Sequence, residues 1–267
     1  MNTIPPPQKS GASITRPLRG RSLSKLFLLA AAAVLCIQEL SAAQFTNGDL
    51  TGPTNTFSLV PPGWSNLPQG TTDTVSTAGH PFSSIGGSGL GNWPYAASPN
   101  GGTFAWSSDF FQANTAQPEG LSQTVTGFSV GTVYVVRFEF TNLALYDTNG
   151  NIATNAFGVG QNYDSSGRWL VMANGSLIGA TPLVAPVPMP GTQVWSVFSQ
   201  TFVATSSSIT FAFAADWVSG PGTHVGMGID GIAVVPEPAT PILFLAGVVG
   251  IALLGSKRVR RFYVPRT

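Results

Sequence analysis

Charged residues are scarce in this sequence: they make up 9% of its 267 residues, and lysine is absent between Gln44 and Val235. In that stretch two arginines, Arg137 and Arg168, stand against nine aspartates and glutamates, which gives a net charge of −7. An acidic surface repels the phosphate backbone of nucleic acids, so we expect no nucleic-acid partner. The polar surface must instead come from uncharged side chains, as is common in secreted β-rich proteins.

Cysteine is almost absent as well. The one cysteine, Cys36, lies in the first of two apolar runs, close to the N-terminus. The rest of the chain therefore has no disulfide, no thiol nucleophile and no thiolate metal site. The stretch between the two apolar runs is about 190 residues long, which is enough to bury one core without cross-links.

The first apolar run has the layout of a secretory signal peptide. A basic stretch precedes the apolar residues 26–37, and small residues end at Ala43, just before Gln44. We predict that residues 1–43 are removed by cleavage between Ala43 and Gln44. A lipoprotein signal at Cys36 would need a small residue before the cysteine, and a leucine stands there. A retained anchor is the alternative, although the run is short for a membrane span.

The second apolar run, about residues 239–255, carries no charge. A helix of about 17 residues is roughly 25 Å long, close to the thickness of the hydrocarbon core of a bilayer. Basic residues behind such a span stay in the cytoplasm. Here they are Lys257, Arg258, Arg260 and Arg261. We therefore predict a transmembrane helix within an anchor segment at 235–261, and a cytoplasmic tail at 262–267.

Pro236, Glu237 and Pro238 stand in front of this run. They favour an extended segment, because each proline fixes its own φ and disfavours helix in the residue before it. The order of tripeptide, apolar span and basic end resembles the PEP-CTERM sorting signal of exported proteins in Gram-negative bacteria. That resemblance implies exosortase as a partner, an enzyme of the inner membrane thought to recognise the tripeptide and remove the tail. An ordinary anchor behind a chance pair of prolines is the alternative.

The central region, residues 44–234, shows short strands between Gly, Pro, Asn and Ser turns. Apolar residues alternate with mixed ones over 133–140, which predicts a strand with one buried face. Asn174-Gly175 predicts a two-residue hairpin turn. Strands at 194–202 and 209–213, joined by a turn, suggest a second hairpin. No amphipathic helix of useful length appears, so we predict an all-β fold, a single jelly-roll β-sandwich.

The order of these pieces resembles the galactose-binding-like jelly rolls, which include carbohydrate-binding modules. The matching stretches are 47–50 with 62–64, then 134–141, 195–205 and 229–232. The segment 73–116 fits no part of that pattern. The resemblance implies a structural calcium between the early loop and the last strand, with Asp49 and Asp230 at the matching positions. We expect no other cofactor.

No catalytic residues stand out. The sequence has two histidines, His80 and His224, and no G-x-S-x-G or H-E-x-x-H motif. A glycosidase needs two carboxylates across a cleft, but nothing in the spacing of the acids selects a pair. Asp147, Asn149 and Asn151 have an oxygen spacing that suits calcium, yet the same sequence is a good turn, and we favour the turn.

Sugars are bound by flat aromatic faces beside polar side chains. The candidates for a ligand site are Trp93, Tyr95, Asp216 and Trp217, whereas Trp64 and Trp195 are more typical of a core. We therefore expect a non-enzymatic, exosortase-processed protein of the cell surface or extracellular matrix that interacts with extracellular polysaccharide. The alternatives are a secreted glycan hydrolase or lyase on the same scaffold, and a permanently anchored adhesin.

Overall fold

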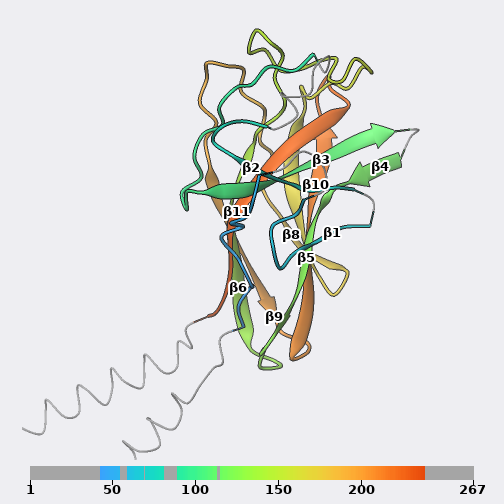
Figure 1. Ribbon diagram of the computed structural model, residues 1–267. Helices are drawn as coiled ribbons and strands as arrows, with labels where there is room; N and C mark the ends of the chain where they lie inside the picture. The colour runs from blue at the N-terminus through green and yellow to red at the C-terminus, as the bar shows by residue number, and fades with distance from the viewer. Residues whose placement is uncertain (1–42, 55–58, 69, 81–88, 113–114, 238–267) are drawn as a thin grey trace, which may run out of the picture. The chain divides into compact units, whose positions relative to one another are not determined.

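The computed structural model describes residues 43–54, 59–68, 70–80, 89–112 and 115–237, with the side chains of 110–117 left out. These residues form two antiparallel sheets packed face to face, so the predicted all-β jelly-roll sandwich is confirmed (Figure 1). The described part of the chain contains no α-helix, and hence none long and apolar enough to span a membrane.

One sheet has five strands in the order β1-β5-β10-β7-β8. Their bounds are β1 Ser65–Asn66, β5 Gly120–Thr126, β10 Ser208–Ser219, β7 Ser166–Ala173 and β8 Ser176–Ala180. The turn between β7 and β8 is the predicted Asn174-Gly175 hairpin, and both residues have positive φ, of 48° and 77°. Such backbone angles favour asparagine and glycine, which explains why this turn was readable from sequence.

The other sheet has six strands, five of them in the order β2-β3-β11-β6-β9, with β4 paired to β3. Their bounds are β2 Asp73–Ser76, β3 Thr103–Gln112, β11 His224–Pro236, β6 Val133–Asn142, β9 Ser196–Val203 and β4 Thr115–Pro118. The last strand therefore lies in the middle of its sheet. It continues to Pro236, two residues beyond the domain limit expected at residue 234.

The hairpin expected between 194–202 and 209–213 is wrong. β9 pairs with β6 in one sheet, whereas β10 pairs with β5 and β7 in the other. The turn between them carries the chain across the sandwich. Phe202 and Phe211 consequently meet across the core, with ring centroids 5.3 Å apart, instead of lying side by side on one face. The apolar pattern identified both strands but did not reveal which sheet each one joins.

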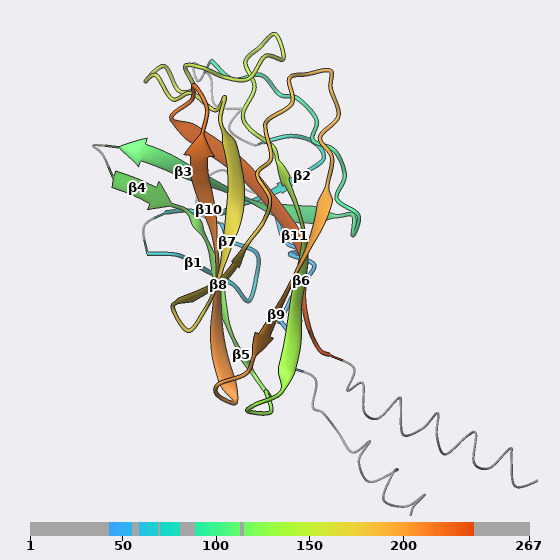
Figure 2. The ribbon, with the colours of Figure 1, turned by 180° about the vertical axis from the view of Figure 1, so that it is seen from behind.

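The core has two parts. The larger lies between the sheets and is rich in aromatic rings; Phe138, Trp169 and Phe213 in it are fully buried. The smaller lies on the outer side of β3 beneath long loops, and includes Phe104, Trp106 and Leu145 among others. Figures 1 and 2 show these loops gathered at one end of the sandwich, and the β5–β6 and β9–β10 turns at the opposite end.

Candidate functional site

A small pocket opens among the long loops, on the outer side of the smaller core. Its lining residues are His80, Leu90, Gly91, Trp93, Tyr95, Leu145 and Tyr146. The structure thus brings together two of the aromatic residues that the sequence suggested, Trp93 and Tyr95, and adds a histidine and a second tyrosine. Sequence analysis missed His80 and Tyr146 as members of this site.

The two predicted aromatics play different parts in this pocket. Trp93 is half-buried, and its indole N–H donates to the carbonyl oxygen of Asp147 over 2.8 Å, which fixes the plane of the ring. Tyr95 is 4% exposed, and its hydroxyl donates to the Ala144 carbonyl over 3.0 Å. Tyr95 is therefore part of the smaller core and has no open face for stacking. Of the two, only Trp93 is less than fully buried.

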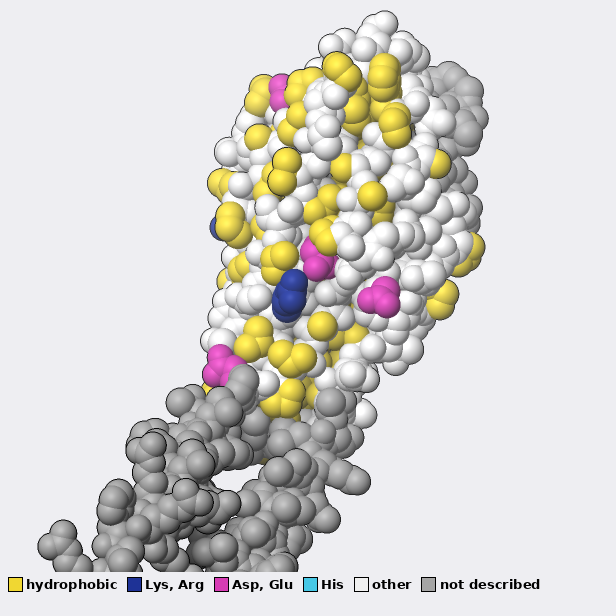
Figure 3. Space-filling model, turned by 90° about the vertical axis from the view of Figure 1, so that its left-hand side faces the viewer, with side chains coloured by type: hydrophobic (Ala, Val, Ile, Leu, Met, Phe, Trp, Pro, Cys, Tyr) yellow, Lys and Arg dark blue, Asp and Glu magenta, His cyan; other side chains and the backbone are white. Residues whose placement is uncertain are grey.

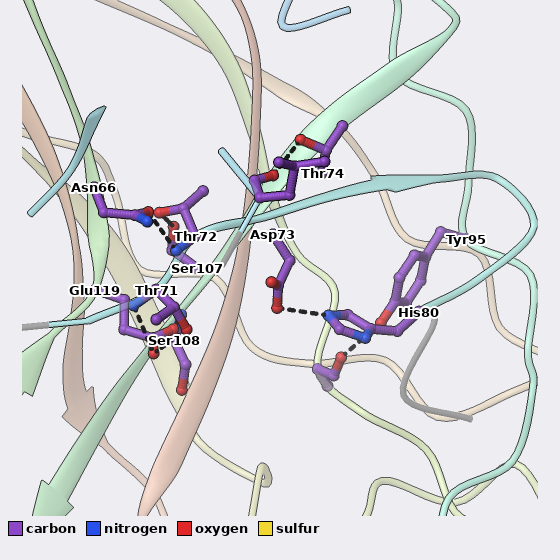
Figure 4. A network of polar contacts seen from close by, with 12 residues as sticks. Asn66, Thr71, Thr72, Asp73, Thr74, His80, Tyr95, Ser107, Ser108 and Glu119 are labelled. Carbon is purple, nitrogen blue, oxygen red and sulfur yellow. Dashed lines mark hydrogen bonds and ion pairs between the residues drawn. The ribbon is translucent and has the colours of Figure 1, made fainter. Parts of the chain in front are cut away.

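His80 lies at this pocket beside a buried carboxylate. Its Nε2 is 3.6 Å from Oδ2 of Asp73, the first residue of β2, and both side chains are buried. Figure 4 shows the His80 ring pointing toward the Asp73 carboxylate. The rings of His80 and Trp106 meet edge-on, with centroids 4.6 Å apart. Burial lowers the pKa of His80, and the hydrogen bond and charge of Asp73 oppose that effect. A single histidine and aspartate, with neither in a recognisable motif, gave no signal in the sequence.

Glu119 belongs to the same polar network, shown in Figure 4. Its two carboxylate oxygens accept hydrogen bonds from the backbone N–H of Ser108 (2.8 Å) and of Thr71 (3.2 Å). Burial nevertheless raises the pKa of Glu119 to about 7, with a further contribution from the charge of Asp73. Between Glu119 and Asp73, the hydroxyls of Thr72 and Ser107 share a hydrogen bond of 2.8 Å.

The other two predicted ligand residues, Asp216 and Trp217, lie on β10 and do not line the pocket. Oδ2 of Asp216 is 2.6 Å from Nε of Arg168 on β7, so its charge is already paired. The Trp217 indole N–H donates to the Ser165 hydroxyl over 2.8 Å, and its backbone N–H donates to Asp109. The four predicted ligand residues therefore do not form one site.

The early loop and the last strand do meet, as the jelly-roll resemblance implied. The backbone N–H of Ile232 donates to the Gly48 carbonyl over 2.8 Å. Asp230 is fully buried, and its carboxylate accepts hydrogen bonds from the Ser98 hydroxyl and the Gly231 N–H. Burial raises the pKa of Asp230 to about 7, and the charges of Glu139 and Asp49 add to that shift.

The carboxylates of Asp49 and Asp230 supply the oxygen ligands that calcium prefers, but calcium takes six to eight ligands. Among the residues that the structure describes, no group of three or more His, Cys, Asp or Glu side chains is placed to hold a metal. Asp49 itself is exposed. The calcium expected at Asp49 and Asp230 therefore remains a prediction, and its remaining ligands would have to be carbonyl oxygens or water.

The Asp147 loop is a turn, as favoured from its sequence. Oδ1 of Asp147 accepts the backbone N–H groups of Asn149 (2.8 Å) and Asn151 (2.9 Å), and Oδ2 accepts the Asn151 side chain. The carboxylate thus replaces the backbone acceptors that a tight turn lacks.

The residues at the two predicted processing points lie at the ends of the described chain. Ala43 is 1% exposed and belongs to the larger core, whereas Gln44 is exposed. Pro236 is the last residue of β11 and stands opposite Tyr134 of β6. The exposed Glu237 still donates its backbone N–H to the Val133 carbonyl over 3.0 Å. The other predicted residues lie outside the described part of the chain: Pro238, Lys257, Arg258, Arg260 and Arg261.

No protein-family model matches this sequence, and no curated protein matches it. Among solved structures, the chain is similar to a Stig cyclase, Fisc, from Fischerella sp. TAU, at 16% identity and a TM-score of 0.42, covering 74% of this chain and 99% of that one. It is also similar to a CBM4 structure, at 14% identity and a TM-score of 0.36, covering 72% and 99%. A third is the EclA C-terminal domain, a sugar-binding protein, at 17% identity and a TM-score of 0.32, covering 52% and 89%.

Proposed function

We propose that this chain is an exported protein of a Gram-negative bacterium, held in the inner membrane by its C-terminal apolar segment and then processed by exosortase at Pro236-Glu237-Pro238. The observation that carries the proposal is where the fold ends. β11 finishes at Pro236, and Glu237 makes the last described hydrogen bond to the sheet. The part of the sandwich that the structure describes therefore ends at the tripeptide, so cleavage there would release all of these strands together.

A precursor with two epitope tags, one in the mature region and one in the tail that is removed, tests this proposal. One tag follows Gln44 and the other follows Thr267. In cells with exosortase, we expect the first tag on the cell surface or in the medium and the second tag lost from the same molecules. Glu237→Ala should keep both tags together in the inner membrane. If both tags stay on the mature surface protein, the chain is a permanently anchored adhesin.

For the sandwich itself we propose a non-catalytic role in contact with extracellular polysaccharide, with Trp93 as the stacking residue. Trp93 is held by its hydrogen bond to Asp147 and is only half-buried at the pocket. An aromatic face fixed in one orientation stacks on the C–H groups of a sugar at low entropic cost. The mature protein, displayed on a glycan array, should bind a polysaccharide.

Two variants localise that binding. Trp93→Ala should weaken it at least tenfold, whereas Trp217→Ala on β10 should leave it unchanged. The reverse result would move the site to β10, and no binding by the folded wild type would reject the proposed role. Near-UV circular dichroism confirms that each variant is folded.

A glycan hydrolase or lyase is the second candidate, and the His80–Asp73 pair favours it. Burial lowers the pKa of His80, so the imidazole is neutral near pH 7 and has the form that a general base requires. The test is to incubate the mature protein with polysaccharides and measure new reducing ends or unsaturated ends. Activity that is lost in His80→Gln would establish an enzyme. Absence of activity across the polysaccharides that the protein binds would support the non-catalytic role.

A further inference from the structure

The end of the sandwich where β11 finishes has an unusual surface. Four valines there have substantially exposed side chains, at fractions of 65% for Val130, 36% for Val133, 55% for Val203 and 52% for Val235. They come from the β5–β6 turn, the start of β6, the end of β9 and the end of β11. Val133 and Val203 are direct partners across neighbouring strands, so the side chains of these two valines are adjacent.

This end is also almost free of charge. The described segments that build it are 127–133, 203–208 and 234–237, and Glu237 is their one ionisable side chain. Figure 3 shows a side face of the molecule on which charged side chains are few, with hydrophobic ones scattered among uncharged groups. An uncharged, valine-tipped end has little affinity for a charged protein partner, and it costs little to bring against lipid.

The position of the apolar segment fixes how far this end can stand from a membrane. Glu237 is still hydrogen-bonded to Val133, and the apolar run of the sequence begins at about residue 239. Two extended residues reach about 7 Å at most. The headgroup layer on one side of a bilayer is about 5–7 Å thick. A sandwich tied so closely to an inserted segment has no room for a water layer beneath it.

We propose that, in the membrane-held precursor, this end of the sandwich rests in the lipid headgroup layer, with Val130, Val133, Val203 and Val235 in contact with lipid. This inference rests on the proposed insertion of the C-terminal segment. It gives the domain a fixed orientation, with the long loops and the Trp93 pocket directed away from the bilayer. It also places Pro236 and Glu237 at the membrane surface, where a membrane-embedded protease acts.

Site-specific fluorescence on the full-length precursor tests the orientation. Because the domain has no cysteine, Cys36→Ser leaves a background in which single cysteines are introduced at Val130 or Val203. The matched control is Val194→Cys, since Val194 is 70% exposed and precedes the start of β9, whereas Val203 ends that strand. Each variant is labelled with a polarity-sensitive dye and reconstituted into phosphatidylcholine vesicles, with or without spin-labelled lipid.

We expect spin-labelled lipid to quench the dye at positions 130 and 203 at least twofold more than at position 194. Equal quenching at all three positions would overturn the inference. Flotation of the same vesicles separates this outcome from failure of the proposed function: protein that does not float lacks the anchor, whereas protein that floats with equal quenching lacks only the lipid contact.

A second variant controls for quenching that arises because the dye itself disturbs the end of the sandwich. Eight Gly and Ser residues inserted between Glu237 and Pro238, after the last described hydrogen bond to the sheet, form a flexible spacer with a mean span of about 15 Å. The spacer should bring quenching at position 130 down to the level at position 194 while the protein still floats. Unchanged quenching at position 130 would contradict the proposed geometry.

Discussion

Glu119 is the residue through which the buried polar network should influence stability. Burial raises its pKa from 4.5 to about 7, so between these values the folded state holds a proton that the unfolded state has lost. Its contribution to the free energy of unfolding is therefore present below about pH 4.5 and is lost as the pH rises to about 7. The facing titratable groups are Asp73, whose charge adds to the shift, and Tyr163, whose pKa burial raises further above this range.

We expect Glu119→Gln to reduce the fall in stability between pH 4.5 and 7, leaving the part that comes from Asp230, whose pKa burial also raises to about 7. Urea unfolding of both proteins at several pH values measures the slope. A matched substitution, Glu237→Gln, changes an exposed carboxylate and should leave the slope as in the wild type. An unchanged slope in Glu119→Gln would mean that Glu119 titrates normally in the folded protein.

The calcium predicted at Asp49 and Asp230 can be tested by thermal unfolding. If calcium binds at Asp49 and Asp230, added Ca²⁺ should raise the Tm of the mature protein in a concentration-dependent way, because a ligand of the folded state stabilises it. Chelation should reverse the effect, and Asp49→Asn should weaken it without changing the buried Asp230. Identical melting curves in calcium and in chelator would show that no calcium binds at Asp49 and Asp230.

Gly231 shows how an element depends on one residue. It lies at the irregularity in β11 between Asp230 and Ala233, with φ of 60°. A Cβ at this position would come within 1.9 Å of Oε2 of Glu139 and 2.0 Å of Nδ2 of Asn100. The glycine therefore lets β11 bend while the side chains of Glu139 and Asn100 stay hydrogen-bonded to each other.

We expect Gly231→Ala to lower the free energy of unfolding by about 2–4 kcal/mol, since it combines positive-φ strain with a steric clash. Gly175→Ala is the control, because Gly175 also has positive φ but nothing within 4 Å of its Cβ position. It should cost about 1 kcal/mol. The same loss of stability in Gly231→Ala and Gly175→Ala, measured by thermal unfolding, would show that β11 adjusts to the extra carbon.

The strands also show what a sequence pattern can and cannot supply. β6 was predictable because its buried face alternates with a mixed one, and the Asn174-Gly175 hairpin because its turn needs those residue types. β3 was missed because both of its faces are buried: Ala105 faces the other sheet, whereas Phe104 and Trp106 face the loops. A strand covered on both sides has no polar face to mark its period.

The candidate site was harder to predict than the fold. Trp93 and Tyr95 were predicted from their place in a Gly/Pro-rich loop, and both line the pocket, although Tyr95 is buried in the smaller core. His80 and Asp73 were not predicted, because their proximity depends on how β2 and the following loop pack against Trp106. Such contacts depend on tertiary packing, and no local pattern of residues in this sequence predicts them.

At the scale of the whole molecule, charge is distributed by region. Five basic residues precede the first apolar run and five follow the second, whereas the region between them has a net charge of −7. Basic residues beside an apolar run are typical of ends that stay on the cytoplasmic side, so this distribution is the one that the proposed export predicts. This arrangement, together with a last strand, β11, that ends at Pro236, is the basis of the proposed export and processing.

The mass of the intact mature protein is the most direct measurement of that account. Protein recovered from the cell surface or medium of a strain with exosortase should begin at Gln44 and end close to the Pro236-Glu237-Pro238 tripeptide, with or without an attached group. A C-terminal peptide ending at Thr267 in that same mature protein would contradict the central claim, because the apolar tail would then be permanent.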